Sequence, residues 1–510
     1  MNIENKIGDS RQKRVLFSSI SGIIFSIISL IFSFVLRKIF LTKIGVEYLG
    51  LYTFLTGIFG LLTTVDGGVC SSLFIKIHKP IAENNIAEIR RSYKLIKIVY
   101  MIRAALVLLI GIILFFLLNW LASDVIIPIK EVKIAYLIYL FLNAISYLFI
   151  YNEFLLEAYQ KRYLTNIYLF VVSITFTIIN GIFLFLVGNF YVYLVIQVLI
   201  NLVSYILCTF AVKKRYPFLF TKIKLDMSSS AEIKDMFKIT YYTLSSVIVR
   251  NTDNILITKL LGFTTNGIYS SYKMLNSQIF NLLGKIKYSA QDSTRNYLVV
   301  KDKKSSLKML SNLTFIYFWL AGFCTIALSA LSTPFIILWL GSNYTLGIIP
   351  IFLTALTLFI EMLIFPYDDA FYSLELYKKN KYIPIVEIFI NLSISIILGI
   401  YFGITGIMIG TLSYLLFKSF IRIKMIMKNY YEISYIKVLL KFIFYIFIVI
   451  ISFSITYYIL SFISGKDLLS FVYKVLITAI LPNIIITLFT FWTDEFRWVI
   501  NLVKKYLKKS

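Results

Sequence analysis

Charged side chains within long apolar segments are the residues of this sequence best suited to chemistry. Arg250 and Asp253 lie three residues apart in segment 239–261, where they share a helix face and can pair, and Asn254 extends the polar surface. Lys273 follows in the next segment. At about 1.5 Å per residue, Arg250 lies roughly 18 Å and Lys273 roughly 20 Å from the inner ends of their helices. A charge at a bilayer centre costs on the order of 3 kcal/mol, so these residues indicate a paired or water-facing site.

A stripe of polar and small residues extends from Lys273 along one helix face. Steps of four and three join its members, and an equivalent stripe occupies segment 48–75. A water-filled cleft and close helix packing both explain such faces, and both interpretations stay open. The stripes comprise Tyr269, Lys273, Ser277, Asn281 and Gly284, and Tyr52, Thr56, Gly60, Thr64 and Gly67.

Other charges lie in or beside the apolar segments. Asp66 and Arg103 each lie roughly 15 Å from the inner surface, and we interpret them as a structural pair rather than a ligand site. Glu361 is a mid-segment carboxylate and a candidate proton-coupling group. Asp368 and Asp369, close after Pro366, are expected to reach the inner interface, and residues near segment ends are expected to extend toward water: Lys259, Glu387 and Lys474.

The composition predicts that membrane-spanning helices position these residues. Of 510 residues, 59% are hydrophobic and 15% are charged, against about 25% charged in soluble domains, and the mean hydropathy is +0.84. Apolar runs of 18 or more residues can each cross about 30 Å of hydrocarbon as a helix. We therefore predict an all-α polytopic membrane protein with about 14 transmembrane helices. The segments are 15–36, 48–75, 95–118, 134–156, 164–187, 190–212, 239–261, 267–287, 310–331, 346–372, 382–402, 404–424, 437–462 and 470–492.

The basic residues predict the orientation. With the N-terminus inside, about 40 of the 51 Lys and Arg fall in inside connections, as the positive-inside rule requires. Both termini are then cytoplasmic. The net charge of +26 is explained by this topology and by attraction to anionic lipids. No connection is long enough for a folded basic domain, so nucleic-acid binding is excluded as a function.

Catalytic and metal-binding patterns are absent from the sequence. The single histidine, His78, lies in an inside loop between lysines and is expected to be solvated. The three cysteines lie in apolar segments, and there is no phosphate-binding loop or metal-ligand spacing. The outside connections are short, which disfavours a membrane glycosyltransferase or polymerase. No cofactor is expected, and coupling to H⁺ or Na⁺ stays open.

An internal repeat organises the chain. Gly45-x4-Gly50 recurs as Gly262-x4-Gly267, and the Leu-Glu-x-Tyr motif at Leu156 recurs at Leu374, six segments later. Because six is even, the two halves are predicted to be parallel repeats about an axis along the membrane normal, with a substrate site between them. The predicted divisions are an N-lobe at 1–212, a linker at 213–238, a C-lobe at 239–425 and two further helices with a basic tail at 426–510.

Four short motifs carry a family resemblance. They are Gly45-x4-Gly50-Leu51-Tyr52, Asp66-Gly67-Gly68, Gly262-x4-Gly267-Ile268-Tyr269 and Gly403-Ile404-Thr405-Gly406, the last within a small-residue turn and contact face from Gly399 to Gly410. With them the sequence resembles the polysaccharide-export branch of the multidrug/oligosaccharidyl-lipid/polysaccharide (MOP) superfamily, specifically O-antigen (Wzx-type) flippases. Asp66-Gly67-Gly68 departs from the commoner Asp-Leu-Gly pattern.

The resemblance implies two six-helix lobes in a V, as in MATE and other MOP exporters, and a cationic central cavity. It implies a bacterial inner-membrane flippase that passes a polyprenyl-pyrophosphate-linked oligosaccharide to the outer leaflet, with membrane lipids, a polysaccharide polymerase and a chain-length regulator as partners. On this hypothesis Arg250 and Lys273 attract the pyrophosphate, Asp253 holds Arg250 in the empty site, and the sugars face Tyr269, Asn276 and Asn281. A multidrug/cation antiporter is the alternative, disfavoured because a cationic drug would favour carboxylates.

Overall fold

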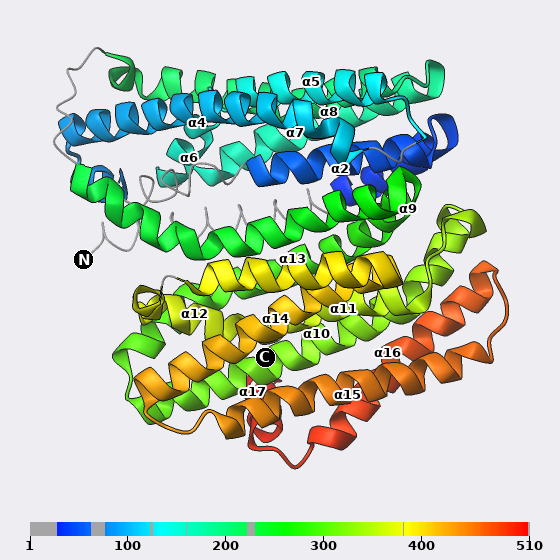
Figure 1. Ribbon diagram of the computed structural model, residues 1–510. Coiled ribbons are helices and arrows are strands. Elements are labelled where there is room, and N and C mark those ends of the chain that lie inside the picture. Colours follow the sequence, from blue (N-terminus) through cyan, green and yellow to red (C-terminus); the bar gives the residue numbers. More distant parts are fainter. Residues whose placement is uncertain are drawn as a thin grey trace. The chain divides into compact units, whose positions relative to one another are not determined.

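The computed structural model describes residues 28–62, 77–122, 126–159, 161–221, 230–380 and 382–507. Within these ranges the regular secondary structure is helical (Figure 1). Nine described helices are long and apolar enough to cross a membrane, or ten if the bent pair α11 (Ile348–Leu363) and α12 (Phe365–Ser373) is one span. The predicted all-α polytopic fold is therefore confirmed, whereas the number fourteen stays a prediction.

The chain divides into two compact units, Met1–Gly267 (unit 1) and Ile268–Ser510 (unit 2). The long helix α9 (Ser230–Val300) contributes to both, and its backbone departs from helical geometry at Gly262. The predicted lobe boundaries stay a prediction.

Unit 1 consists of spans with short connections. Asn189 illustrates how a span begins, because its side chain accepts hydrogen bonds from the amides of Tyr191 and Val192 and so caps the helix that follows. Besides the first part of α9, the named elements are α2 (Val46–Leu62), α4 (Ile86–Leu121), α5 (Ile129–Ser146), α6 (Tyr151–Ala158), α7 (Arg162–Leu186), α8 (Phe190–Arg215) and the 3₁₀ turn η1 (Pro217–Phe220).

Unit 2 contains the remainder of α9 and the C-terminal helices, coloured green to red in Figure 1. The chain bends by 40° between α11 and α12, where Pro366 stands in the first turn of the second helix. The other elements are α10 (Lys303–Trp339), η2 (Ser342–Tyr344), η3 (Leu376–Lys379), α13 (Ile383–Phe402), α14 (Ile404–Ile426), η4 (Met427–Tyr431), α15 (Ile436–Ser461), α16 (Leu468–Thr490) and α17 (Asp494–Leu507).

Within unit 1 the two copies of the repeated glycine motif have the same geometry. Gly45 and Gly262 both adopt positive φ, at 107° and 81°, a conformation that residues with a Cβ rarely adopt. A Cβ on Gly50 would lie 1.9 Å from the Phe263 carbonyl oxygen, and one on Gly267 would lie 2.2 Å from the Val46 carbonyl oxygen. The first glycine of each copy makes a turn and the second allows close backbone contact, so the motif is a scaffold feature.

The Gly399–Gly410 stretch forms the turn and contact face predicted for it. Gly403 ends α13 and precedes α14. A Cβ on Gly406 would lie 2.0 Å from the Leu398 carbonyl oxygen, and one on Gly410 would lie 2.0 Å from the Ser395 hydroxyl. These two helices therefore pack backbone to backbone in unit 2, which fixes the positions of the charged residues that they carry.

Candidate functional site

A buried ionic cluster joins three helices of unit 2. Asp368 lies in α12, Glu387 in the first turns of α13, and Lys418 and Arg422 in α14. Lys418 and Arg422 are four residues apart, so they share one face of α14. The bend before α12 directs Asp368 to that face. We call these four residues the ionic cluster.

Asp368 is held by both cations of the ionic cluster. One carboxylate oxygen of Asp368 lies 2.6 Å from the Lys418 ammonium, and the other lies 3.1 Å from Nε of Arg422. Charge-assisted hydrogen bonds of this kind are roughly twice as strong as neutral ones. The guanidinium of Arg422 also lies 3.9 Å from the centre of the Phe371 ring, in α12, a cation–π contact.

Glu387 completes the ionic cluster. Its side chain is fully buried, and one carboxylate oxygen lies 3.6 Å from a terminal nitrogen of Arg422, which is also fully buried. Two carboxylates and two cations make the cluster neutral. Since buried charges are stable only when paired, the arrangement suits an ionic lock between α12, α13 and α14.

Asp369 forms a second ionic contact beside the cluster. One carboxylate oxygen accepts hydrogen bonds from Nε of Arg295, at 2.7 Å, and from the side-chain amide of Gln291, at 2.8 Å. Both donors lie on α9, so Asp369 ties α12 to that helix within unit 2. The Asp369 side chain is buried.

The structure corrects the sequence interpretation of Asp369 and Glu387. Because both residues lie near the ends of predicted segments, we expect Asp369 to reach the interface and Glu387 to extend toward water. Both expectations are wrong, since both side chains are buried. Sequence reasoning missed Lys418 and Arg422. The signal that could have identified them is their four-residue spacing within an otherwise apolar segment.

In unit 2, the predicted substrate residues of α9 differ in their surroundings. Tyr269 is buried, and its hydroxyl donates to the sulfur of Met408 at 3.4 Å. The ammonium of half-buried Lys273 lies 5.9 Å from the Tyr269 ring centre. Asn276 donates to the Thr354 carbonyl at 3.3 Å, while Asn281 is exposed. Thus Tyr269 and Asn276 have partners inside unit 2, and Asn281 presents its amide at a surface.

In unit 1, the predicted residues of α9 differ in burial. Arg250 is exposed, whereas Asp253 and Asn254 are buried. A Cβ on Gly57 of α2 would lie 3.0 Å from the Asn254 Cβ, and one on Gly60 would lie 1.9 Å from the Asn251 side-chain oxygen. Between these two helices, close packing therefore accounts for Gly60 of the α2 stripe.

Other predicted residues are also placed. The guanidinium of Arg103 lies 4.6 Å from the Tyr147 ring centre, a cation–π contact. Its predicted partner Asp66 lies outside the described residues, as do Thr64 and Gly67 of the α2 stripe. Glu361 is half-buried in α11. His78 is exposed, in agreement with a solvated side chain, but it lies in a helical segment rather than in the predicted loop. Among the described residues, no group of three or more His, Cys, Asp or Glu could hold a metal ion.

Comparison with protein families gives one match. A family described as polysaccharide biosynthesis protein matches residues 13–290 of the sequence. No curated protein matches the sequence.

Comparison with solved structures gives matches over most of the chain. The lipid II flippase MurJ, in an inward closed conformation, is 17% identical with a TM-score of 0.62, covering 93% of this chain and 98% of its own. A point mutant of the Vibrio cholerae MATE transporter VcmN is 14% identical with a TM-score of 0.59, and the alignment covers 84% of this chain and 98% of the VcmN chain. A MOP superfamily transporter from Pyrococcus furiosus is 12% identical with a TM-score of 0.56, and the alignment covers 82% of this chain and 96% of the transporter. At these identities the similarity establishes a shared fold.

Proposed function

Because the chain belongs to the polysaccharide biosynthesis protein family, we propose that it is a flippase for a polyprenyl-pyrophosphate-linked oligosaccharide. It would move the repeat unit of an O-antigen, capsule or other surface polysaccharide from the cytoplasmic to the outer leaflet by alternating access. Family membership is the observation that carries this proposal. The multi-pass helical fold shared with MOP superfamily members supports a transporter rather than an enzyme.

The extent of the structural similarity also supports a flippase. The alignment with the MATE structure includes 98% of the MATE chain but only 84% of this chain. The alignment with the flippase MurJ includes 98% of the MurJ chain and 93% of this chain. The chain is therefore longer than the MATE fold by an amount that the MurJ fold largely includes. A cationic-drug exporter of the shorter MATE type explains less of the chain.

The intramembrane cations agree with an anionic cargo. A pyrophosphate is attracted by lysine and arginine, whereas a cationic drug would favour carboxylates. In unit 2, half-buried Lys273 is the basic residue that we assign to the pyrophosphate, with exposed Asn281 on the same stripe for the sugars. In unit 1, exposed Arg250 has the same role, and Asp253 three residues later holds it when no cargo is bound.

A leaflet assay in proteoliposomes tests the proposal. A fluorescent polyprenyl-pyrophosphate oligosaccharide in the inner leaflet is expected to become accessible outside with wild-type protein. Lys273→Ala and Arg250→Ala, tested singly, should each slow transfer about tenfold or more, since a charge-assisted contact contributes about 1.5–3 kcal/mol. Lys304→Ala, which removes a charge from an exposed position in α10, is the matched control. Unchanged transfer in both α9 variants would reject the residue assignment, and export of cationic dyes without lipid transfer would reject the flippase.

The proposal extends to location and partners. It places the chain in a bacterial cytoplasmic membrane with both termini inside, and it predicts association with a polysaccharide polymerase and a chain-length regulator. Protease cleavage of a tag after Ser510 checks the orientation. The tag should be cut only in inverted membrane vesicles, and cleavage in intact spheroplasts would contradict it.

A further inference from the structure

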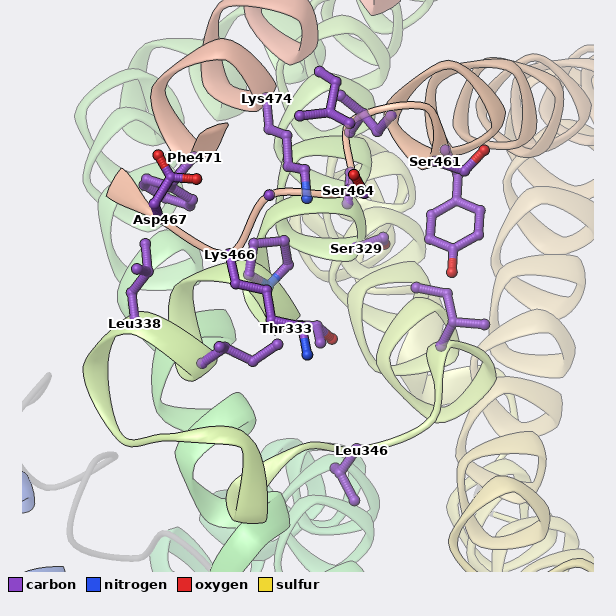
Figure 2. Close-up of a pocket in the computed structure, with 18 residues that line it drawn as sticks. Ser329, Thr333, Leu338, Leu346, Ser461, Ser464, Lys466, Asp467, Phe471 and Lys474 are labelled. Carbon is purple, nitrogen blue, oxygen red and sulfur yellow. The ribbon is translucent and has the colours of Figure 1, made fainter. Parts of the chain in front are cut away.

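A pocket of about 300 Å³ lies in unit 2 where the connection between α15 and α16 meets the last turns of α10 (Figure 2). Its polar wall includes Lys466, Lys474, Ser464 and Thr333, and Figure 2 shows both lysine side chains pointing into it. The rest of its wall is mostly aliphatic. Neither the family match nor the proposed transport path assigns a role to this pocket.

Local structure brings the two lysines together. Asp467 caps α16 by accepting hydrogen bonds from the Ser470 amide, at 3.4 Å, and hydroxyl, at 2.5 Å, which fixes the start of the helix directly after Lys466. Lys466 precedes this cap and Lys474 lies in the second turn of α16, and both line the same pocket. A single lysine near a helix end can be explained by extension of its side chain toward the membrane interface. That explanation does not account for two lysine side chains that point into the same cavity.

Three of the polar donors that line this pocket lack a partner within the described part of the chain. Among the residues that the structure describes, Lys466, Lys474 and Ser464 make no hydrogen bond, ion pair or ring contact. Asp467 also lines the pocket, but its carboxylate is engaged by Ser470, whose hydrogen bonds hold the pKa of Asp467 below its usual range. One ionised carboxylate and two ammonium groups give the pocket a net charge of +1.

The remaining wall suits the apolar part of a lipid. Ile337, Leu338 and Ile348 contribute from α10 and α11, and Leu460 and Phe471 from α15 and α16. The pocket lies at the ends of these apolar helices, and helix ends correspond to the headgroup level of a bilayer. A soluble anion would need no aliphatic wall of this kind.

We propose that this pocket binds the phosphate of an anionic membrane phospholipid, with Lys466, Lys474 and Ser464 as donors. The headgroup lies between the two ammonium groups, and the glycerol and first methylenes lie against the aliphatic wall. In the orientation predicted from the basic residues, the bound lipid is in the outer leaflet. This site is independent of the transport proposal.

Native mass spectrometry of the full chain in detergent tests the proposal, with phosphatidylglycerol, phosphatidylcholine and inorganic phosphate as separate probes. Each basic residue near a lipid phosphate contributes about fivefold to affinity, so Lys466→Ala/Lys474→Ala should weaken phosphatidylglycerol binding on the order of thirtyfold. Lys504→Ala/Lys505→Ala removes the same charge from the exposed end of α17 and should leave that binding unchanged. Phosphatidylcholine should bind weakly to all three proteins, and inorganic phosphate should not displace the lipid.

A second variant separates the pocket from surface charge. Thr333→Phe keeps both lysines and fills the cavity, so it too should abolish the tight lipid adduct. Retained binding in Thr333→Phe, or equal loss in the two lysine double variants, would show that charge alone attracts lipid and would overturn the proposal. Displacement by millimolar inorganic phosphate would overturn the lipid assignment in favour of a soluble anion.

Discussion

Two groups of basic side chains in unit 2 occupy opposite settings. Lys418 and Arg422 of the ionic cluster are largely or fully buried, and both contact Asp368. Lys466 and Lys474, in the pocket, have no partner among the described residues. A buried cation must be paired to be stable, whereas an unpaired cation at the bilayer interface can still attract a ligand. The comparison assigns the first group to stability and the second to binding.

Breaking the ionic cluster should have the largest effect on stability. Arg422→Met leaves Asp368 with Lys418 alone and leaves the fully buried carboxylate of Glu387 without its cation. The free energy of unfolding in detergent micelles should fall by about 3–5 kcal/mol, the usual effect of removing one member of a buried ion pair.

Lys428→Met is the control for Arg422→Met. Lys428 lies six residues further along, in η4, and is exposed, so its replacement should change the free energy of unfolding by no more than about 0.5 kcal/mol. Similar small losses in both variants would mean that the ionic cluster does not stabilise unit 2, and the contrast with the pocket lysines would disappear.

Neutralising Asp369 should have an intermediate effect. Asp369→Asn keeps the shape and one acceptor oxygen but removes the charge that Arg295 and Gln291 bind. Because Arg295 is 43% exposed, we expect a loss near the lower end for charged hydrogen bonds, about 1.5 kcal/mol, in chemical unfolding. Glu375→Gln, which disrupts an exposed pair with Lys378, should give no measurable loss. A larger loss in the control would contradict burial as the cause.

The helices and their turns were predictable from sequence because each depends on local properties. Segment 382–402 corresponds to α13 (Ile383–Phe402), and Gly403 ends it as expected. In hydrocarbon every backbone amide must be bonded within its own helix, so apolar length alone identifies a span. The repeated glycines were likewise visible as a string, since a turn with positive φ accepts few other residues.

The ionic cluster was not predictable because it depends on packing between helices. Glu387 and Arg422 are 35 residues apart, and they meet only because α13 and α14 pack back to back after Gly403. Depth along a helix indicates how far a charge lies from the interface, but not toward which neighbour it points. The same reason explains why helical spacing alone did not show that Tyr269 is buried against Met408.

The attachment of α17 should depend on pH. Burial raises the pKa of Glu495, but hydrogen bonds from Lys441 and Ser311 outweigh burial and bring that pKa below its ordinary value of 4.5. A carboxyl whose pKa is lowered by folding stabilises the folded form above the ordinary pKa, and this contribution is lost as pH falls through the lowered pKa. Since the side chain of its partner Lys441 is 33% exposed, solvent screens the pair, and the effect should be below about 1 kcal/mol.

Hydrogen exchange measures this smaller effect. Amides of α17 should exchange faster, after correction for intrinsic rates, at pH 3.5 than at pH 6. In Glu495→Gln the dependence should vanish, while Asp494→Asn, an exposed neighbour, should keep it. An α17 that is equally protected at both pH values in the wild type would show that its stacking on Trp319 through Phe496 suffices for attachment.

Removing the pocket lysines should have the smallest effect on stability. In lipid-free detergent, Lys466→Ala/Lys474→Ala should change the free energy of unfolding by no more than about 0.5 kcal/mol, because neither lysine has a partner to lose among the described residues. Added phosphatidylglycerol should stabilise the wild type and not the double variant, since a ligand stabilises only the form that binds it. A loss in lipid-free detergent as large as that of Arg422→Met would assign these lysines to the scaffold, and the two groups of cations would then serve the same purpose.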